Sequence, residues 1–325
     1  MKRTLVAVLI VSIMALGVPA TNEAADLGII TGKEKGTYFQ FGQDLRTLAE
    51  KDGLDLRVEP SNGSIENIYA VYKRPGIAMG IVQSDVLAFV SRVQSNPALK
   101  AVARKIKMVF PLYNEEIHLL GRGGLKDFDE LAGKRVAVGE EGSGTYLTAR
   151  LLFEVSRIKP KETVMIGTDA ALQQLKEGKI DAMFYVAGFP VKLFKENVSQ
   201  SDGLRLLTIS NPKILQFYPK AEIPAGTYSW QTDTVQIATV KAVLVCFDFR
   251  TVQCQLIGKF ARLIADQLTW LQQNGHPKWK SVDLGYRLKG WNQYDCVTRY
   301  NPQTVVKNPK IEPNPVMDAV KQVLE

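Results

Sequence analysis

The sequence predicts an α/β protein of two lobes, each built on a mostly parallel sheet flanked by helices. Apolar residues alternate between a period of two and a period of 3.6 through the first two thirds of the chain, as they do in βα units. About 300 residues follow the N-terminal leader described below, which is more than one hydrophobic core usually organises. A late β-branched run, residues 235–247, is expected to return the chain to the first lobe.

Three strands and the helices between them are expected in the first lobe. Residues 27–31 and 77–82 are apolar runs and residues 54–58 alternate, so each predicts a strand. Apolar side chains recur at helical spacing after the first two strands, and they are Phe41, Leu45, Leu48 and Ala49 in one segment and Ile65, Ile68, Tyr69 and Tyr72 in the next. Another helix is expected to open at residues 83–85.

The pattern restarts after residues 107–113, which marks the second lobe. Strands are expected at residues 117–120, 135–138, 164–166 and 180–186, with a long helix carrying Leu147, Leu151, Leu152 and Val155. The helix before the last strand is expected to close at Gly178, because glycine is common just past a helix end. Residues 255–271 predict an amphipathic helix. The expected lobes are therefore 26–113 with 232–300, and 114–231, followed by a tail at 301–325.

The first residues have the form of a secretory signal peptide. Lys2 and Arg3 precede the apolar stretch 5–16, and small-residue cleavage candidates follow at 18–20 and 23–25. The apolar stretch is shorter than the ~20 residues that a membrane-spanning helix needs. We therefore expect residues 1–25 to be removed and the mature chain to be exported.

Composition argues against metal, cofactor and nucleic-acid chemistry. Cys246, Cys254 and Cys296 allow one disulfide and leave one thiol, and their spacing does not choose the pair. There is no CxxC motif, and His118 and His276 are far apart, so no metal site and no cofactor are expected. The formal net charge of +8 can steer an anion, but the basic residues are scattered, which gives nucleic-acid binding no support.

No catalytic residue is expected either. The histidines lie near no Gly-x-Ser-x-Gly elbow, and His118 falls inside a strand pattern typical of a packed side chain. The carboxylate pairs Glu115-Glu116 and Glu140-Glu141 are adjacent, so in strands they point to opposite faces. We expect them to be surface residues.

The candidate binding residues lie in loops that follow predicted strands. Ligands of open α/β sheets bind outside the carboxyl ends of the strands. Glycines there let backbone N–H groups turn toward a guest while the next helix directs its positive end at it, which suits a carboxylate or phosphate. The candidates are Gly36, Thr37, Tyr38, Ser61, Asn62, Gly63, Ser64, Asn67, Gln83, Ser84, Asp85, Gly142, Ser143, Gly144, Thr145, Gly188 and Pro190.

The residues of these loops can also be explained by a purely structural role, with no bound ligand. Residues 139–145 imitate a nucleotide-binding P-loop, but Thr145 stands where that motif needs Lys, which argues against ATP. Ser143 or Thr145 can simply cap the following helix, as Ser64 can cap the one before. Asp85 suits the first turn of a helix by its charge.

At these same loops the sequence resembles the TAXI family of solute receptors from TRAP (tripartite ATP-independent periplasmic) transporters. The matching segments are Gly36-Thr37-Tyr38-Phe39, Gly63-Ser64-Ile65-Glu66-Asn67, residues 80–85, 133–136, 142–145, 178–182 and 188–190, with a weaker echo at 276–280. The resemblance implies a type II periplasmic-binding-protein fold, a periplasmic location, no enzymatic activity, and handover of the solute to TRAP membrane subunits. Relatives are associated with glutamate, glutamine or other small organic acids. The sister TRAP receptors hold a carboxylate with an arginine, which the matched strand-to-helix loops here lack.

Three segments depart from the family pattern and bear on the ligand. Residues 33–35 (Lys-Glu-Lys) place charge where relatives carry smaller residues, residues 73–76 form an unusual turn, and the cysteines and the tail have no counterpart. We expect the lobes to close about a hinge near Tyr113 and residues 235–240, with Tyr38, Tyr113 and Tyr185 shaping the cavity. Two alternative hypotheses are a receptor of the same fold that serves an ATP-driven importer or a sensor, and an exported enzyme.

Overall fold

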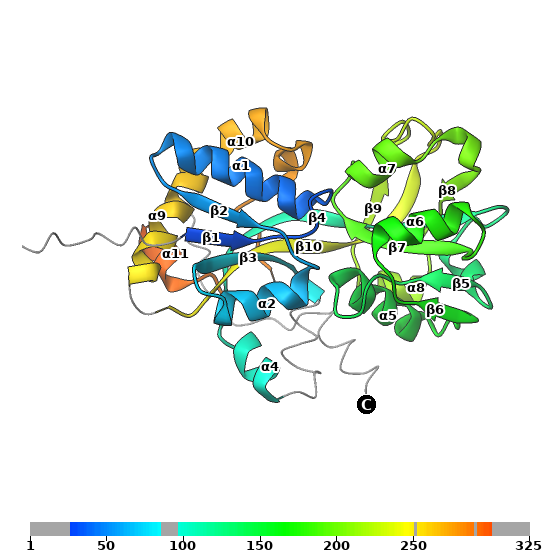
Figure 1. The fold of residues 1–325 in the computed structure, drawn as a ribbon, viewed down its shortest axis with the longest axis horizontal. Helices are drawn as coiled ribbons and strands as arrows, with labels where there is room; N and C mark the ends of the chain where they lie inside the picture. Colours follow the sequence, from blue (N-terminus) through cyan, green and yellow to red (C-terminus); the bar gives the residue numbers. More distant parts are fainter. Residues whose placement is uncertain (1–26, 86–96, 250–251, 289–290, 301–325) are drawn as a thin grey trace, which may run out of the picture.

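A computed structural model describes residues 27–85, 97–249, 252–288 and 291–300 (Figure 1). Two groups of helices and strands lie side by side, joined by the long strands β4 (Ile106–Arg122) and β10 (Val235–Phe247). We call them the first lobe and the second lobe. The expected signal peptide and the tail lie outside the described residues, and the limits that we expect for the lobes stay a prediction.

Each lobe contains alternating strands and helices, as the sequence predicts. The first lobe holds β1 (Leu27–Ile30), α1 (Thr37–Lys51), β2 (Leu56–Glu59), α2 (Ser64–Lys73), β3 (Ile77–Gln83), α4 (Pro97–Ala103), α9 (Val252–Asp266), α10 (Leu268–Asn274), η3 (Pro277–Ser281) and α11 (Asp295–Tyr300). The second lobe holds η1 (Phe128–Leu131), β5 (Arg135–Ala137), α5 (Gly144–Ser156), β6 (Glu162–Val164), α6 (Thr168–Lys176), β7 (Ala182–Ala187), α7 (Lys192–Asn197), η2 (Gln200–Asp202), β8 (Leu204–Leu206), α8 (Pro212–Leu215) and β9 (Lys220–Ile223).

One sheet runs through both lobes in the order β2-β1-β3-β10-β4-β7-β5-β6. The pairs β1/β2, β1/β3, β5/β6 and β5/β7 are parallel, whereas β10 and β4 pair antiparallel with their neighbours. The α/β class with a mostly parallel sheet in each lobe is thereby confirmed. Because the outer strands are parallel and their helices cross back, the strand-to-helix loops of each lobe lie at the carboxyl ends of the strands.

Strand β4 is continuous where the sequence predicted a break. We expected a boundary after residue 113 and a new strand at 117–120, yet a single strand pairs with β10 over residues 106–116 and with β7 over residues 116–121. Glu116 is the residue at which these two pairings overlap, opposite Thr239 on one side and Ala187 on the other. The chain therefore passes between the lobes inside a strand, without an intervening loop.

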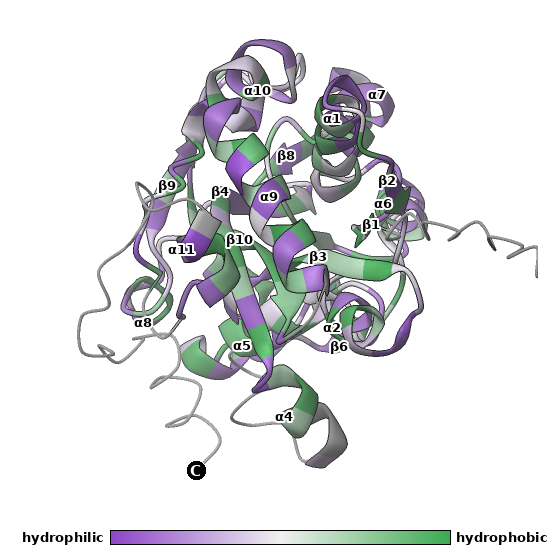
Figure 2. Ribbon diagram, turned by 90° about the vertical axis from the view of Figure 1, so that its left-hand side faces the viewer, coloured by the Kyte–Doolittle hydropathy of each residue, from purple (hydrophilic) through white to green (hydrophobic). Residues whose placement is uncertain are grey.

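The buried apolar faces of the elements form the core of each lobe. In Figure 2 hydrophobic residues gather along β3 and β10 in the interior of the first lobe, and β3 is buried at every position. Phe41, Leu45 and Leu48 of α1 are buried, as expected. Tyr72 of α2 is 46% exposed, so its predicted place on the buried face was wrong, and Val71 takes the core position instead.

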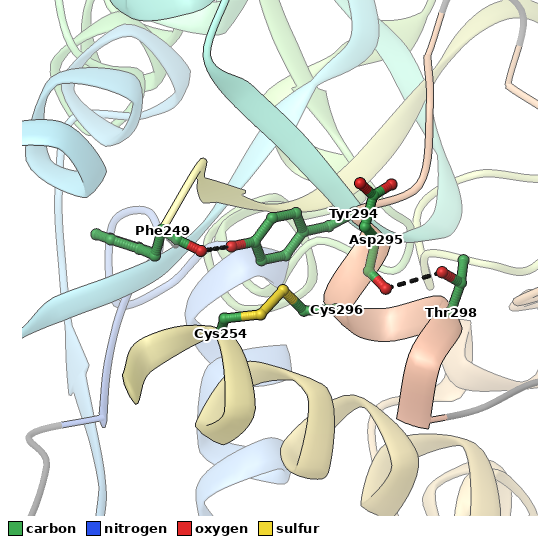
Figure 3. The surroundings of a disulfide bond; sticks show 6 residues. All are labelled: Phe249, Cys254, Tyr294, Asp295, Cys296 and Thr298. Atoms are coloured by element: carbon green, nitrogen blue, oxygen red, sulfur yellow. Dashed lines mark hydrogen bonds between the residues drawn. A yellow bond between two sulfur atoms is a disulfide. The ribbon is translucent and has the colours of Figure 1, made fainter. Parts of the chain in front are cut away.

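The C-terminal part of the first lobe differs from the prediction in its helices and contains one disulfide. The helix expected over residues 255–271 is divided into α9 and α10 at Gln267. Cys254 of α9 is bonded to Cys296 of α11, which leaves Cys246 as a buried free thiol (Figure 3). The Tyr294 hydroxyl beside this bond donates to the Phe249 carbonyl. The bond thus ties the end of the described chain to the body of the lobe.

Across the described residues, none of the helices combines the length and the apolar character needed to cross a bilayer.

Candidate functional site

A cavity of about 90 Å³ lies where the strand-to-helix loops of the two lobes meet. We call it the central cavity. The first lobe lines it with Gly32, Lys33, Gly36, Thr37, Tyr38, Asn62, Gly63, Ser64, Gln83 and, at the crossing strand, Glu115, and the second lobe with Gly139, Glu140, Ser143, Gly144, Thr145, Gly167, Thr168, Tyr185, Val186 and Ala187. Its size suits a small metabolite better than a drug-sized molecule, whose pockets span about 300–1,000 Å³.

Four helix N-termini border the central cavity, two from each lobe. They belong to α1 and α2 in the first lobe and to α5 and α6 in the second. Helices α1, α2 and α6 have Gly36, Gly63 and Gly167 as N-caps, and none of these caps offers a side chain to the first backbone N–H groups. Uncapped N–H groups and the positive helix ends together favour an anion, so the arrangement suits a carboxylate.

Most of the loop residues predicted for binding line the central cavity. They are Gly36, Thr37, Tyr38, Asn62, Gly63, Ser64, Gln83, Ser143, Gly144 and Thr145. Several also hold the protein together locally, because the Ser143 hydroxyl accepts from the Tyr146 N–H at 3.1 Å and Thr145 Oγ1 accepts from the Val186 N–H at 3.2 Å. Ser143 is thus both cap and lining residue, while a contact with solute stays a prediction for all ten.

Ser64 does not cap its helix, contrary to one of our readings. Gly63 is the N-cap of α2, and its φ of 121° lies in a region that favours glycine. The Ser64 hydroxyl instead accepts from the backbone N–H of Gln83 at 3.0 Å. This bond joins the start of α2 to the end of β3.

The remaining predicted residues lie behind the lining. Ser61 Oγ lies 2.6 Å from Asn67 Oδ1, and the Asn67 amide donates to two backbone carbonyls, so both residues hold the first-lobe loops. Ser84 Oγ accepts from the Lys241 N–H at 3.3 Å, and Gly142 turns the chain with a φ of 80°. Asp85 is buried against the second lobe.

Loop 188–190 also stands behind the lining. The Gly188 carbonyl accepts a 2.8 Å hydrogen bond from Thr37 Oγ1, and the Phe189–Pro190 peptide bond is cis. Pro190 lies beside His276, whose side chain bonds to the Pro190 backbone. The loop therefore reaches the central cavity through Thr37.

Although the sequence singles out segments 33–35 and 139–145, several lining residues are not among the predicted candidates. They are Gly32, Lys33, Glu115, Gly139, Glu140, Gly167, Thr168, Val186 and Ala187. Gly167-Thr168 shows the same signal as the loops that were recognised, since it follows a predicted strand and opens a helix. Val186 and Ala187 gave no such signal, because apolar strand ends are indistinguishable from core in a sequence.

The pair Glu115-Glu116 is buried, so its assignment to the surface was wrong. Each residue is 2% exposed. The two side chains make separate contacts, Glu115 Oε2 with the Tyr38 hydroxyl at 2.7 Å and Glu116 with the Lys278 ammonium. Burial raises the pKa of the Glu115 carboxyl well above its usual value, and it also raises that of Glu116 and lowers that of Lys278.

Gln83 brings an acceptor without a partner to the central cavity. Its Oε1 atom is buried and has no hydrogen-bond partner among the described residues. The same atom lies against Gly144 of the opposite lobe, where an added Cβ would come within 1.8 Å of it. An unpaired buried acceptor is costly, and a donor on a bound solute would relieve that cost.

Side chains connect the lobes around the central cavity. Lys33 Nζ pairs with Glu140 Oε1 at 2.9 Å and Lys35 Nζ with Asp169 Oδ1 at 2.7 Å. Asp85 Oδ2 accepts from Thr148 Oγ1 at 2.8 Å and from the Tyr218 hydroxyl at 3.2 Å. These contacts hold the lobes together, so the described conformation is a closed one.

The histidines are structural groups in this conformation. His118 is fully buried, with Nε2 2.9 Å from the Tyr228 hydroxyl, and burial lowers its pKa to about 4. His276 caps η3 by accepting from the Lys278 N–H at 3.2 Å. Within the described ranges, no group of three or more His, Cys, Asp or Glu residues is placed to hold a metal ion.

Comparison with known proteins agrees with this architecture. A sequence profile of the NMT1-like family matches residues 29–290. The solved structure of the periplasmic binding protein BugD is 10% identical, with 91% of this chain and 93% of that chain aligned and a TM-score of 0.52. Tv2483 bound to L-arginine is 12% identical, with coverages of 82% and 96% and a TM-score of 0.52. At such identities the similarity establishes the periplasmic-binding-protein fold alone.

Proposed function

The chain belongs to the NMT1-like family, and from this premise we propose that it is a periplasmic solute receptor that captures a small carboxylate and passes it to a membrane transporter. The observation that carries the proposal is the meeting of four helix N-termini from two lobes at the central cavity. Such a site gains affinity only when both lobes engage the solute, which is how a receptor signals that it is loaded.

The binding energy available at this site suits a transport receptor. A charge-assisted hydrogen bond to a carboxylate contributes about 1.5–3 kcal/mol. Three or four such bonds, less the cost of ordering, support a dissociation constant near ~1 μM. We infer that closure turns about a hinge near Tyr113 and residues 235–240, where β4 and β10 join the lobes.

The acceptors in the central cavity favour an amino acid within the carboxylate class. Glu115 and the unpaired Gln83 Oε1 offer oxygen acceptors to a donor group on the solute. An ammonium group would pair with Glu115 and lower its raised pKa, so an acidic amino acid of the glutamate or glutamine type fits better than a plain organic acid. Glu115→Gln should then weaken L-glutamate more than succinate; equal losses for both would contradict this assignment.

The finer assignment is a TAXI receptor of a TRAP transporter. Four of the segments that carry the resemblance, 36–39, 63–67, 80–85 and 142–145, contribute lining residues to the central cavity. Lys33 is the only Lys or Arg among the lining residues in the described part of the chain. Carboxylate binding by backbone N–H groups and hydroxyls agrees with that composition. The described residues that line the central cavity include no histidine or cysteine, which supports our proposal that the protein is a receptor and not an enzyme.

Mass spectrometry of the small molecules released from natively purified protein tests the proposal. We expect a carboxylate, and calorimetry with L-glutamate, L-glutamine and succinate should then give micromolar binding to at least one. Release of a non-carboxylate solute with no binding to the three probes would overturn the function. Co-purification with a TRAP membrane subunit would support the assignment to a TRAP transporter. Co-purification with an ATP-driven permease or a sensor would replace that assignment. A product formed from one of the probes would show that the protein is an enzyme.

A further inference from the structure

A buried ion pair joins the lobes behind the central cavity. Glu116, at the crossing point of β4, contacts the ammonium of Lys278 in η3, and their side chains are 3% and 9% exposed. Neither residue lines the central cavity. Buried ion pairs are weak evidence for stability, since apolar pairs of similar volume often stabilise a protein equally well or better. A contribution to stability therefore does not explain why this ion pair is buried here.

Both partners hold loop 188–190 of the second lobe. Glu116 Oε2 accepts from the backbone N–H of Phe189 at 3.0 Å, and Lys278 Nζ lies 3.9 Å from the centre of the Phe189 ring. Gly188 is packed so closely that an added Cβ would lie 2.7 Å from Tyr113 and 3.1 Å from Lys278. The ion pair and Tyr113 thus fix this loop on one side.

The other side of the same loop reaches the central cavity. The Gly188 carbonyl accepts the 2.8 Å hydrogen bond from Thr37 Oγ1, and Thr37 is the first residue of α1, a lining residue. One short path of contacts therefore runs from Lys278 through Glu116 and loop 188–190 to a helix N-terminus at the site. It links η3, the crossing strand and both lobes.

We propose that Glu116 and Lys278 are positioning residues that set the α1 N-terminus for solute binding through loop 188–190. The inference rests on the proposed function for its solute, while the path of contacts is a property of the protein alone. It also gives a role to the two sequence segments around Phe189 and Lys278 that the central cavity leaves unexplained.

The test replaces both charges together, so that no buried charge is left alone. Glu116→Met with Lys278→Met should still fold, with an unfolding midpoint lowered mainly by the cost of the Phe189 N–H that loses its acceptor. Hydrogen exchange in solute-free protein should quicken at the Phe189 amide and at the first amides of α1. L-glutamate binding should weaken about fivefold to tenfold, the equivalent of one neutral hydrogen bond. The matched control is Arg46→Met with Glu50→Met, an exposed pair of α1 that should change neither readout.

A second cycle separates positioning from general loosening. In a Thr37→Val background the Glu116/Lys278 substitutions should cost less than about twofold, because the hydrogen bond that completes the path is already missing there. Full additivity, or unchanged exchange at loop 188–190, would overturn the proposal. If the double variant fails to fold, Phe189→Leu replaces it and should quicken the same amides. If the wild type binds no L-glutamate, the hydrogen-exchange rates still test the positioning role of Glu116 and Lys278, and only the proposed solute is contradicted.

Discussion

Gly144 offers the sharpest test of two-lobe capture, because it is the point at which the second lobe presses on the first. It is the first residue of α5, and an added Cβ would lie 1.8 Å from Gln83 Oε1, 2.7 Å from Gln83 Cδ and 3.1 Å from Ser64 Oγ. Gln83 is buried, and the space open to its side chain is the central cavity that it lines. Gly144→Ala should therefore either push Gln83 into the central cavity or hold the lobes apart, and both outcomes work against closure on a solute.

The expected loss follows from the bonds that closure completes. If separation removes one or two charge-assisted hydrogen bonds from α5 and α6, about 3 kcal/mol disappears, which is on the order of a 100-fold weaker dissociation constant. Each lobe keeps its own core, so the variant should still fold, although separation of the lobes also breaks inter-lobe contacts such as that of Asp85 Oδ2 with Thr148 Oγ1. We thus expect a folded protein with poor binding.

Calorimetry with L-glutamate and small-angle scattering of the solute-free protein measure the two effects. Gly124→Ala is the matched control, since a Cβ there meets nothing within 4 Å. A Gly144→Ala protein that binds like the wild type and scatters identically would refute the idea that closure at this contact is needed.

Three further predictions address the α5 cap, the buried histidine and the disulfide. Ser143→Ala with Thr145→Ala should weaken L-glutamate binding by at least about tenfold and cost about 1 kcal/mol of stability from the lost cap, checked by calorimetry and urea unfolding. The pKa of His118 is lowered to about 4 in the folded protein, so neutral His118 contributes its full stabilisation above pH 6.5 and loses it as the pH falls toward 4. The free energy of unfolding should therefore fall by up to about 3 kcal/mol over this range. In His118→Gln the fall between pH 7 and 4.5 should be shallower. Replacing Cys254 and Cys296, 42 residues apart, by Ser should lower the free energy of unfolding by about 4 kcal/mol, and equal urea midpoints would contradict this.

The sequence predicted the fold well where the apolar residues of a segment follow a single clear pattern. The β-branched run 235–247 coincides with β10, and Gly178 does follow the end of α6 with a φ of 73°. It failed at Tyr72, because Val71 satisfies nearly the same helical spacing and the smaller residue occupies the core. It also expected a new strand to begin at residue 117, whereas β4 is continuous, because a strand that passes between two lobes carries no turn signal.

The candidate site was predictable in its loops and unpredictable in its charges. Glycine, serine and threonine before a helix are local signals, and they identified three of the four helix N-termini. Glu115 and Glu116 look like solvent-exposed residues in a sequence, because their partners Tyr38 and Lys278 come from segments far away along the chain. Burial of a charged residue depends on such partners, so it emerges only when the lobes are assembled.

The two lobes share a pair of hydrogen-bonded strands, β4 and β10, where many two-part proteins have a flexible linker. Such a ribbon twists readily but cannot slide along its ladder without losing hydrogen bonds. We therefore expect any motion of one lobe against the other to be a rocking about this ribbon. A loaded receptor of this build would present its partner with one reproducible shape, and an empty one would reopen without any external source of energy.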